Sequence, residues 1–165
     1  MRANFKKRKI NEKIFLITLS YGGGGLLVSA CSTSQIHNVQ TKGEISKEFL
    51  YANAKCGDSE EEQYLQKQII NQLKIKNIYG RDLNIKCKIL HFDEGNRFAR
   101  YMIGFGAGAA TTTIKIELKN QQNEKIGEFE VSAEMKMGAF GGSALNTLEE
   151  SAVKIVNFVE KNYIK

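Results

Sequence analysis

The chain has 165 residues with three Cys and neither Trp nor Pro, which suits one compact domain with a short appendage rather than two domains. Its formal charge of +6 arises at the N-terminus, because six bases and only one acid precede Ile14, whereas the rest of the chain holds 18 bases against 17 acids. A protein that binds phosphate backbones needs a basic surface, so this distribution argues against a nucleic-acid partner.

The first thirty residues have the order of a secretory signal. A basic stretch at 2–13 is followed by an apolar run at 14–19, and consecutive glycines at 22–25 interrupt the apolar character. These glycines weaken the run as a permanent membrane span. We therefore expect residues 1–30 to be a signal peptide that directs export.

Val28, Ser29, Ala30 and Cys31 resemble the lipobox of bacterial lipoproteins, in which an aliphatic and two small residues precede the modified cysteine. The resemblance implies a diacylglyceryl thioether on Cys31, cleavage between Ala30 and Cys31, and a further acyl chain such as palmitate on the new N-terminus. The alternative is an uncleaved signal anchor with an incidental Cys. Ser32, in place of Asp after the lipidated residue, implies an outer-membrane address facing the periplasm in an organism with two membranes.

Residues 31–46 comprise the lipidated cysteine and a polar segment without a sustained apolar period, which predicts a flexible tether. The alternative is that Ile36 and Val39 belong to a short edge strand. The remaining residues, 47–165, are expected to form a single domain.

The domain is predicted to begin with a strand at 47–55, which contains a short apolar run. Ser59 and Glu62 then have the spacing of a capping box, which predicts a helix start. A turn centred on Gly80 ends this helix. One apolar stripe runs along it, formed by Leu65, Ile69 and Leu73.

Three further segments, at 83–92, 111–119 and 128–135, alternate apolar and polar side chains with the period of half-buried strands. The last two predict a hairpin, with a bulge near Gly127 because Ile126 is out of phase. A closing helix over 145–163 has an apolar face formed by Leu148, Ala152, Ile155, Val159 and Tyr163. These elements predict an α+β fold in which a small, mainly antiparallel sheet has two helices packed on one face.

Two glycine-rich stretches, at 101–114 and 137–148, contain no charged residue. Their glycines include Gly104, Gly106, Gly108, Gly138, Gly141 and Gly142. The first stretch does not match a dinucleotide-binding loop, because a strand rather than a helix follows it. Three interpretations remain open: interaction loops in an oligomer, loops that touch the membrane, or close packing of the backbone.

Cys56 and Cys87 gain significance from the expected export, because an oxidising compartment permits a disulfide between them. The alternative is that Cys87, which is in phase with Ile85 and Ile89, is a small buried apolar residue.

His91, Asp93 and Glu94 form a cluster that suggests an acid/base pair or a metal site, while His37 lies apart from them in the chain. Zinc usually needs three or four protein ligands, and a hydrolytic triad needs a nucleophile next to an oriented base. Neither set is apparent, so the sequence predicts no catalytic residues, no metal and no cofactor.

The glycine-rich loops and the hairpin between them carry a family resemblance. Their motifs are GFGAGAA at 104–110, EKIG at 124–127 and GAFGGS at 138–143. Residues 49–163 resemble a family of small bacterial lipoproteins with a domain of unknown function, the one numbered 4410, and this resemblance brings no catalytic residues with it. In the order of its elements, the chain is also similar to periplasmic domains of envelope assembly lipoproteins, including those of curli secretion and of penicillin-binding-protein activation.

The sequence therefore predicts a membrane-anchored envelope lipoprotein that acts as a non-enzymatic interaction or scaffolding module. Its expected partners are the lipid bilayer, through acylated Cys31, and an envelope protein or further copies of the chain. The alternative is an oligomerising accessory of envelope assembly, in secretion or cell-wall synthesis. An enzyme is a third class.

Overall fold

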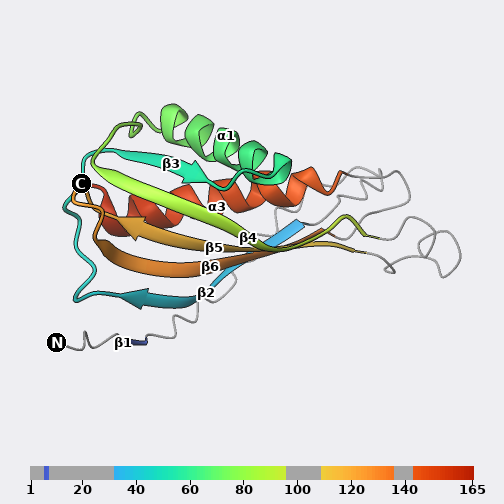
Figure 1. Cartoon of the computed structure of the whole chain (residues 1–165), viewed down its shortest axis with the longest axis horizontal. Helices are drawn as coiled ribbons and strands as arrows, with labels where there is room; N and C mark the ends of the chain where they lie inside the picture. Colours follow the sequence, from blue (N-terminus) through green and yellow to red (C-terminus); the bar gives the residue numbers. More distant parts are fainter. Residues whose placement is uncertain (1–5, 8–31, 96–108, 136–142) are drawn as a thin grey trace, which may run out of the picture.

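A computed structural model describes residues 6–7, 32–95, 109–135 and 143–165 (Figure 1). These residues form a six-stranded sheet in the order β1-β2-β6-β5-β4-β3 together with two helices. The elements are β1 (Lys6–Lys7), β2 (Ser32–Thr41), β3 (Ala52–Cys56), α1 (Glu60–Ile75), β4 (Leu83–Asp93), β5 (Ala110–Lys119), β6 (Lys125–Met135) and α3 (Leu145–Tyr163). Neighbouring strands are antiparallel except β3 and β4, which are parallel. The predicted α+β class is confirmed.

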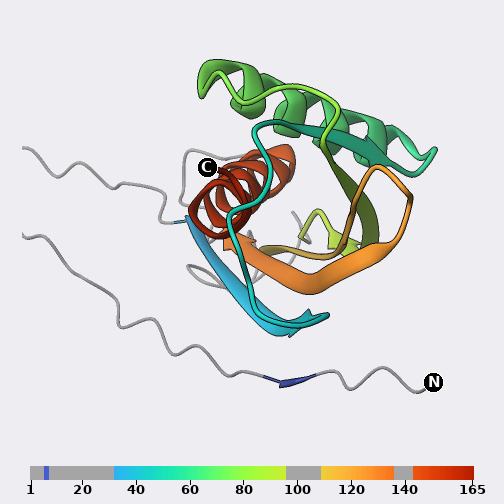
Figure 2. The same ribbon diagram turned by 90° about the vertical axis from the view of Figure 1, so that its left-hand side faces the viewer.

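Both helices lie on one face of the sheet, as predicted (Figures 1 and 2). Helix α1 packs over β3 and β4, whereas α3 packs over β6, β2 and β5, and the two helices also contact each other. Alternate residues of β5 are buried beneath them along its whole length. The predicted apolar faces of both helices are buried, namely Leu65, Ile69 and Leu73 of α1 and Leu148, Ala152, Ile155, Val159 and Tyr163 of α3.

The sheet face without helices carries polar side chains, several of which form ion pairs between strands. The carboxylate of Glu128 lies 2.9 Å from Nζ of Lys115 and 2.6 Å from Nζ of Lys125. Partial burial raises the pKa of Glu128, but hydrogen bonds from the two lysines more than offset it, so the pKa lies below its ordinary value of 4.5. Glu128 is therefore held in its ionised form.

Helix α1 begins at the predicted capping box. The Ser59 hydroxyl accepts a hydrogen bond from the Glu62 N–H at 3.2 Å, and the Glu62 carboxylate accepts one from the Ser59 N–H at 3.3 Å. Reciprocal bonds of this kind satisfy two N–H groups that a helix end would otherwise leave unpaired. The local sequence thus determines where α1 begins after β3.

The hairpin of β5 and β6 contains the predicted bulge. Leu118 pairs with Gly127 and Lys119 pairs with Lys125, so Ile126 is the extra residue. The register shift follows the change of phase seen in the sequence.

Gly127 also has a packing role that the sequence did not reveal. A Cβ atom at Gly127 would lie 2.7 Å from Oη of Tyr163, which is too close for two non-bonded atoms. Burial raises the pKa of Tyr163 to about 12, so the phenol stays neutral where it contacts the bulge. The glycine therefore lets the last turn of α3 lie directly on β6.

Residues 32–41 are not the flexible tether that we expected. They form strand β2, which pairs with β6 from Ser32 to Thr41 with one register shift after His37. Val39 is buried and Ile36 packs against the core. The expectation failed because a strand with only two large apolar residues is ordered here by its pairing with a central strand rather than by its own pattern. The edge strand that we considered as an alternative is the observed structure.

The first predicted strand is present as β3 but begins later than expected, at Ala52. Leu50 and Tyr51 are 55% and 45% exposed, so this apolar run is not buried. The N–H of Phe49 instead donates to the carbonyl oxygen of Tyr163 at 3.1 Å. Contact with the C-terminus, which sequence periodicity cannot show, holds this segment.

Candidate functional site: one end and two edges of the sheet

Several of the predicted site residues lie outside the described residues. They are Ala30, Cys31, Gly104, Gly106, Gly108, Gly138, Gly141 and Gly142. The nearest described residues are Ser32, Gly95, Ala109, Met135 and Ser143. Cys56 and Cys87 are both described.

Strand β2 begins at one end of the sheet, which we call the Ser32 end. Ser32 lies opposite Met135, the last residue of β6, and Met135 lies opposite Ala110, the first residue of β5. Thr111 in turn lies opposite Asp93, the last residue of β4. The residue that follows Cys31 is thus level with the ends of three other strands.

The elements that precede and follow both glycine-rich stretches have their adjoining ends at the Ser32 end (Figure 1). Residues 96–108 lead from β4 to β5, and residues 136–142 lead from β6 towards α3, which starts at Leu145. The residue next to Cys31 and the strand ends next to both connections therefore share one end of the domain. This coincidence depends on strand pairing across the chain, and the sequence could not have shown it.

A buried chain of hydrogen bonds ties the start of α3 to β5 near the same end. The hydroxyl oxygens of Thr112 and Thr147 lie 2.6 Å apart, and the Thr147 hydroxyl donates to the carbonyl oxygen of Ala144 at 2.6 Å. Because the Thr147 proton is used in this way, Thr112 is the donor to Thr147. Both threonines are almost fully buried, so the pair fixes the first turn of α3 on the sheet.

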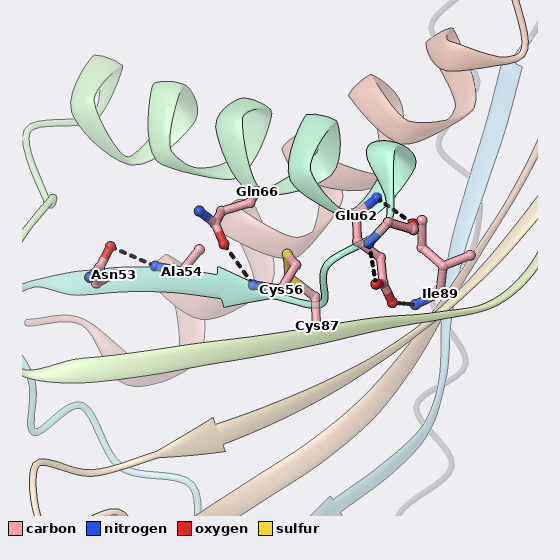
Figure 3. The surroundings of a disulfide bond; sticks show 8 residues. Asn53, Ala54, Cys56, Glu62, Gln66, Cys87 and Ile89 are labelled. Atoms are coloured by element: carbon pink, nitrogen blue, oxygen red, sulfur yellow. Dashed lines mark hydrogen bonds between the residues drawn. A yellow bond between two sulfur atoms is a disulfide. The ribbon is translucent and has the colours of Figure 1, made fainter.

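The outer edge of β3 is closed by hydrogen bonds from within the chain (Figure 3). Its N–H groups donate away from the sheet, from Ala52 to the Ile78 carbonyl oxygen at 2.7 Å, from Ala54 to Asn53 Oδ1 at 2.8 Å, and from Cys56 to Gln66 Oε1 at 2.9 Å. An edge strand whose donors are occupied offers a poor template for another strand. This edge is therefore protected against sheet extension.

The structure joins Cys56 and Cys87 by a disulfide that cross-links β3 to β4 (Figure 3). The two residues are directly opposite each other in the parallel register, with Cα atoms 4.4 Å apart. Beyond the end of β3, the Glu62 carboxylate accepts the N–H of Ile89 in β4 at 3.1 Å. The Glu62 carboxylate thus accepts hydrogen bonds both from the Ser59 N–H at the start of α1 and from a part of β4 that extends beyond β3.

A wide-open hollow of about 650 Å³ lies beside the closed β3 edge. Its polar lining residues are Asn53, Lys55, Asp58, Gln63, Gln66 and Tyr79. The amides are neither nucleophiles nor general bases, and Lys55, Asp58 and Tyr79 contribute ionisable side chains to the lining. In the described part of the chain, no three His, Cys, Asp or Glu residues gather as metal ligands.

Within the described residues, the contacts of the histidines are as follows. Nε2 of His37 lies 3.1 Å from the Ser132 hydroxyl and 3.9 Å from the Glu130 carboxylate. A triad uses one imidazole nitrogen towards the nucleophile and the other towards the acid, whereas here both contacts involve the same nitrogen. In the second histidine cluster, the carboxylate of Asp93 accepts the N–H of Gly95 at 2.8 Å in a turn.

No helix within the described ranges combines the length and the apolar character that a membrane crossing needs.

The sequence profile of a family described as Domain of unknown function (DUF4410) matches residues 51–139, which is more than half of the chain. The chain belongs to the DUF4410 family. This confirms the resemblance found in the sequence motifs. The matched segment of this DUF4410 protein includes Cys56, Cys87 and the strands β3 to β6, whereas Cys31, β2 and α3 lie outside it.

Solved structures with a similar fold share little sequence with this DUF4410 protein. A dodecamer of a PelC variant from Paraburkholderia phytofirmans is 7% identical, with a TM-score of 0.50 over 76% of this chain and 95% of that one. A second PelC dodecamer from the same organism is 9% identical, with a TM-score of 0.47 over 82% and 99%. A candidate lipoprotein from Caulobacter crescentus CB15 is 8% identical, with a TM-score of 0.48 over 67% and 85%. A search of curated proteins finds no match to the chain.

Proposed function

We propose that this DUF4410 protein is a lipid-anchored scaffolding module of the bacterial envelope, held by acylated Cys31 at the outer membrane on its periplasmic side. The observation that carries the proposal is the direct continuity of the lipobox with strand β2. Ser32 is both the residue after the lipidated cysteine and the first residue of a strand that pairs inside the sheet. The lipid therefore attaches to the folded domain without a spacer.

The physical consequence is a domain that lies directly on the headgroups with its Ser32 end nearest the lipid. One acyl chain gives an association constant of about 10⁴ M⁻¹, or about 5 to 6 kcal/mol, and is released easily. Two or three chains on one cysteine make release negligible. The connections that contain the glycine-rich motifs, and that also carry Arg97, Arg100 and Lys136, attach at this same end.

A scaffolding role without catalysis agrees with the groups that the described residues offer. The hollow beside β3 is wide open, with amides, Lys55, Asp58 and Tyr79 in its lining, and the histidine near Ser132 lacks the geometry of a base in a triad. The similarity in fold to PelC, whose structures are dodecamers, supports the second candidate, an oligomerising accessory of envelope assembly in secretion or cell-wall synthesis.

The mass of the protein isolated from its own cells tests the anchor. We expect a chain that lacks residues 1–30 and carries acyl groups on Cys31, in the outer-membrane fraction of a density gradient. A Cys31→Ser variant should lose the acyl mass and be released from membranes. The matched control is the double variant Cys56→Ser and Cys87→Ser, which should remain acylated and membrane-bound. A native protein that keeps residue Met1 and a free thiol on Cys31 would contradict the proposal.

The choice between the two candidates depends on what the domain contacts. Crosslinking in intact cells, followed by identification of the copurified proteins, should give an envelope protein for a simple scaffold and mainly further copies of the chain for the oligomerising accessory.

A further inference from the structure

On the side opposite β3, the sheet ends in β2 and the two-residue β1, and most of the outer side of β2 is open among the described residues. Among the described residues, only Lys6 and Lys7 pair with its outer side, opposite Thr41 and Gln40. The outer side of residues 32–39 carries no described strand. In a paired edge strand, alternate N–H and C=O groups point away from the sheet and are ready to bind another strand.

The two residues that cover part of this edge belong to the expected signal peptide. Cleavage after Ala30 would remove Lys6 and Lys7 together with the rest of residues 1–30. The inference that follows rests on the proposed function in this respect, because the mature chain starts at the edge strand itself.

The composition of β2 contains none of the residues that usually protect an edge. Its ten residues include no Lys, no other charged side chain and no Pro. The side-chain hydrogen bonds of His37 and Asn38 are directed inwards to β6, at 3.1 Å to Ser132 and 2.6 Å to Glu130. They leave the outer backbone groups uncovered, in contrast to the side chains that close β3.

One protective feature is present, a bulge at Asn38, which has a φ of 55° and follows the register shift after His37. The bulge limits the regular part of the edge to residues 32–37. A stretch of this length is still that of an ordinary strand, so the edge is shortened but not closed.

We propose that, in the mature protein, the outer edge of β2 pairs with β2 of a second copy in an antiparallel arrangement that makes one continuous sheet. The closed β3 edge decides this geometry. With a single open edge on each protomer, head-to-tail extension through the sheet is excluded, and the open edge meets its own equivalent around a two-fold axis. An uncharged strand permits this pairing, because no like charges face each other across the axis.

The symmetry has a consequence for the membrane. The two-fold axis of an antiparallel pair is perpendicular to the sheet, so the two Cys31 positions lie at opposite ends of the paired segment. Both lipids enter one leaflet when the joined sheet lies along the membrane surface. The helices occupy one face (Figure 2), so the polar open face is then directed to the headgroups.

A soluble chain of residues 32–165 lacks Cys31, so it tests pairing through the β2 edge without the lipid. All described residues of the buried core lie between Val39 and Ile164, so this chain retains them and is expected to fold without the leader. We expect it to sediment as a dimer at micromolar concentration. The double substitution Thr33→Lys and Gln35→Lys should weaken dimerisation about tenfold or more, because it places like charges across the two-fold axis. Glu150→Lys, at an exposed position of α3, is the matched control and should leave the dimer intact.

Single cysteines provide a second measurement that does not depend on affinity. Gln35→Cys should form a disulfide between protomers under mild oxidation, whereas Glu150→Cys should not. A strict monomer at high concentration would overturn the inference, and so would an oligomer that both edge lysines leave unchanged and that Gln35→Cys does not crosslink. Since the soluble chain lacks Cys31, these results report on the edge alone, while the mass of the native protein reports on cleavage and lipidation alone.

Discussion

Removal of the Cys56–Cys87 bond should destabilise the domain mainly through its unfolded state. The bond closes a loop with a sequence separation of 31 residues. In the chain-entropy description, opening a loop of this length returns about 12 cal/mol/K to the unfolded chain, which is about 3.7 kcal/mol at 25 °C. For a domain of this size, a loss of that magnitude lowers the melting temperature by on the order of 10–20 °C.

The folded state should change little when the bond is removed. Strand β3 remains paired with β4 from Ala52 to Cys56 and keeps its hydrogen bonds to Ile78 and Gln66. Both cysteines are buried, so alanine substitution leaves only small cavities. We therefore expect the double variant Cys56→Ala and Cys87→Ala to keep its circular dichroism spectrum.

Urea unfolding of the 32–165 chain, oxidised and reduced, measures the effect. The reduced chain should unfold at a lower urea concentration and with a larger m-value, because an unfolded chain without a crosslink exposes more surface. The double alanine variant should match the reduced chain and be insensitive to reductant. Equal midpoints for the oxidised and reduced chains would refute the reasoning, and two free thiols in denatured, unreduced protein would show that the bond does not form.

Three further predictions concern packing, a buried hydroxyl pair and pH. Gly127→Ala should lower the free energy of unfolding by about 1–3 kcal/mol in a thermal melt, because the new Cβ meets the Tyr163 hydroxyl. Adding Tyr163→Phe should recover part of this loss, and no recovery would place the strain elsewhere. Thr147→Val should lower the free energy of unfolding in urea by about 1–3 kcal/mol, because it leaves the buried Thr112 donor without its acceptor. The further substitution Thr112→Val should cause no additional loss, and additive losses would argue against the pair. Because the pKa of Glu128 is lowered in the folded state, its ionised carboxylate stabilises the domain at pH values above 4.5, and this stabilisation is lost as the pH falls through the lower folded-state pKa. The stability of Glu128→Gln should therefore depend less steeply on pH in acid, and an unchanged dependence would be the contrary result.

Local chemistry in the sequence determined a large part of the fold. The capping box of Ser59 and Glu62 fixes the start of α1, the phase change at Ile126 fixes the bulge, and the helical period over 145–163 predicts α3 with its observed bounds. These features depend on contacts between residues that are close in the chain, so a single sequence records them directly. The family followed from its glycine-rich motifs in the same way.

Tertiary structure alone decided the elements whose stability comes from distant partners. Strand β2 is polar and is ordered by its register with β6, about a hundred residues away, so its own pattern predicted a tether with a strand only as an alternative. The cysteine pair required the parallel register that α1 creates between β3 and β4.

The candidate site followed the same division. The sequence by itself determined the lipidation motif and the uncharged glycine-rich stretches. Only the folded sheet showed that the strand ends next to these segments lie together at the Ser32 end, that Asn53 and Gln66 close one edge, and that most of the outer side of β2 carries no described strand. The physical reason is that an edge or an end of a sheet is a property of strand order, which is set by long-range pairing and leaves no periodic signal in the chain.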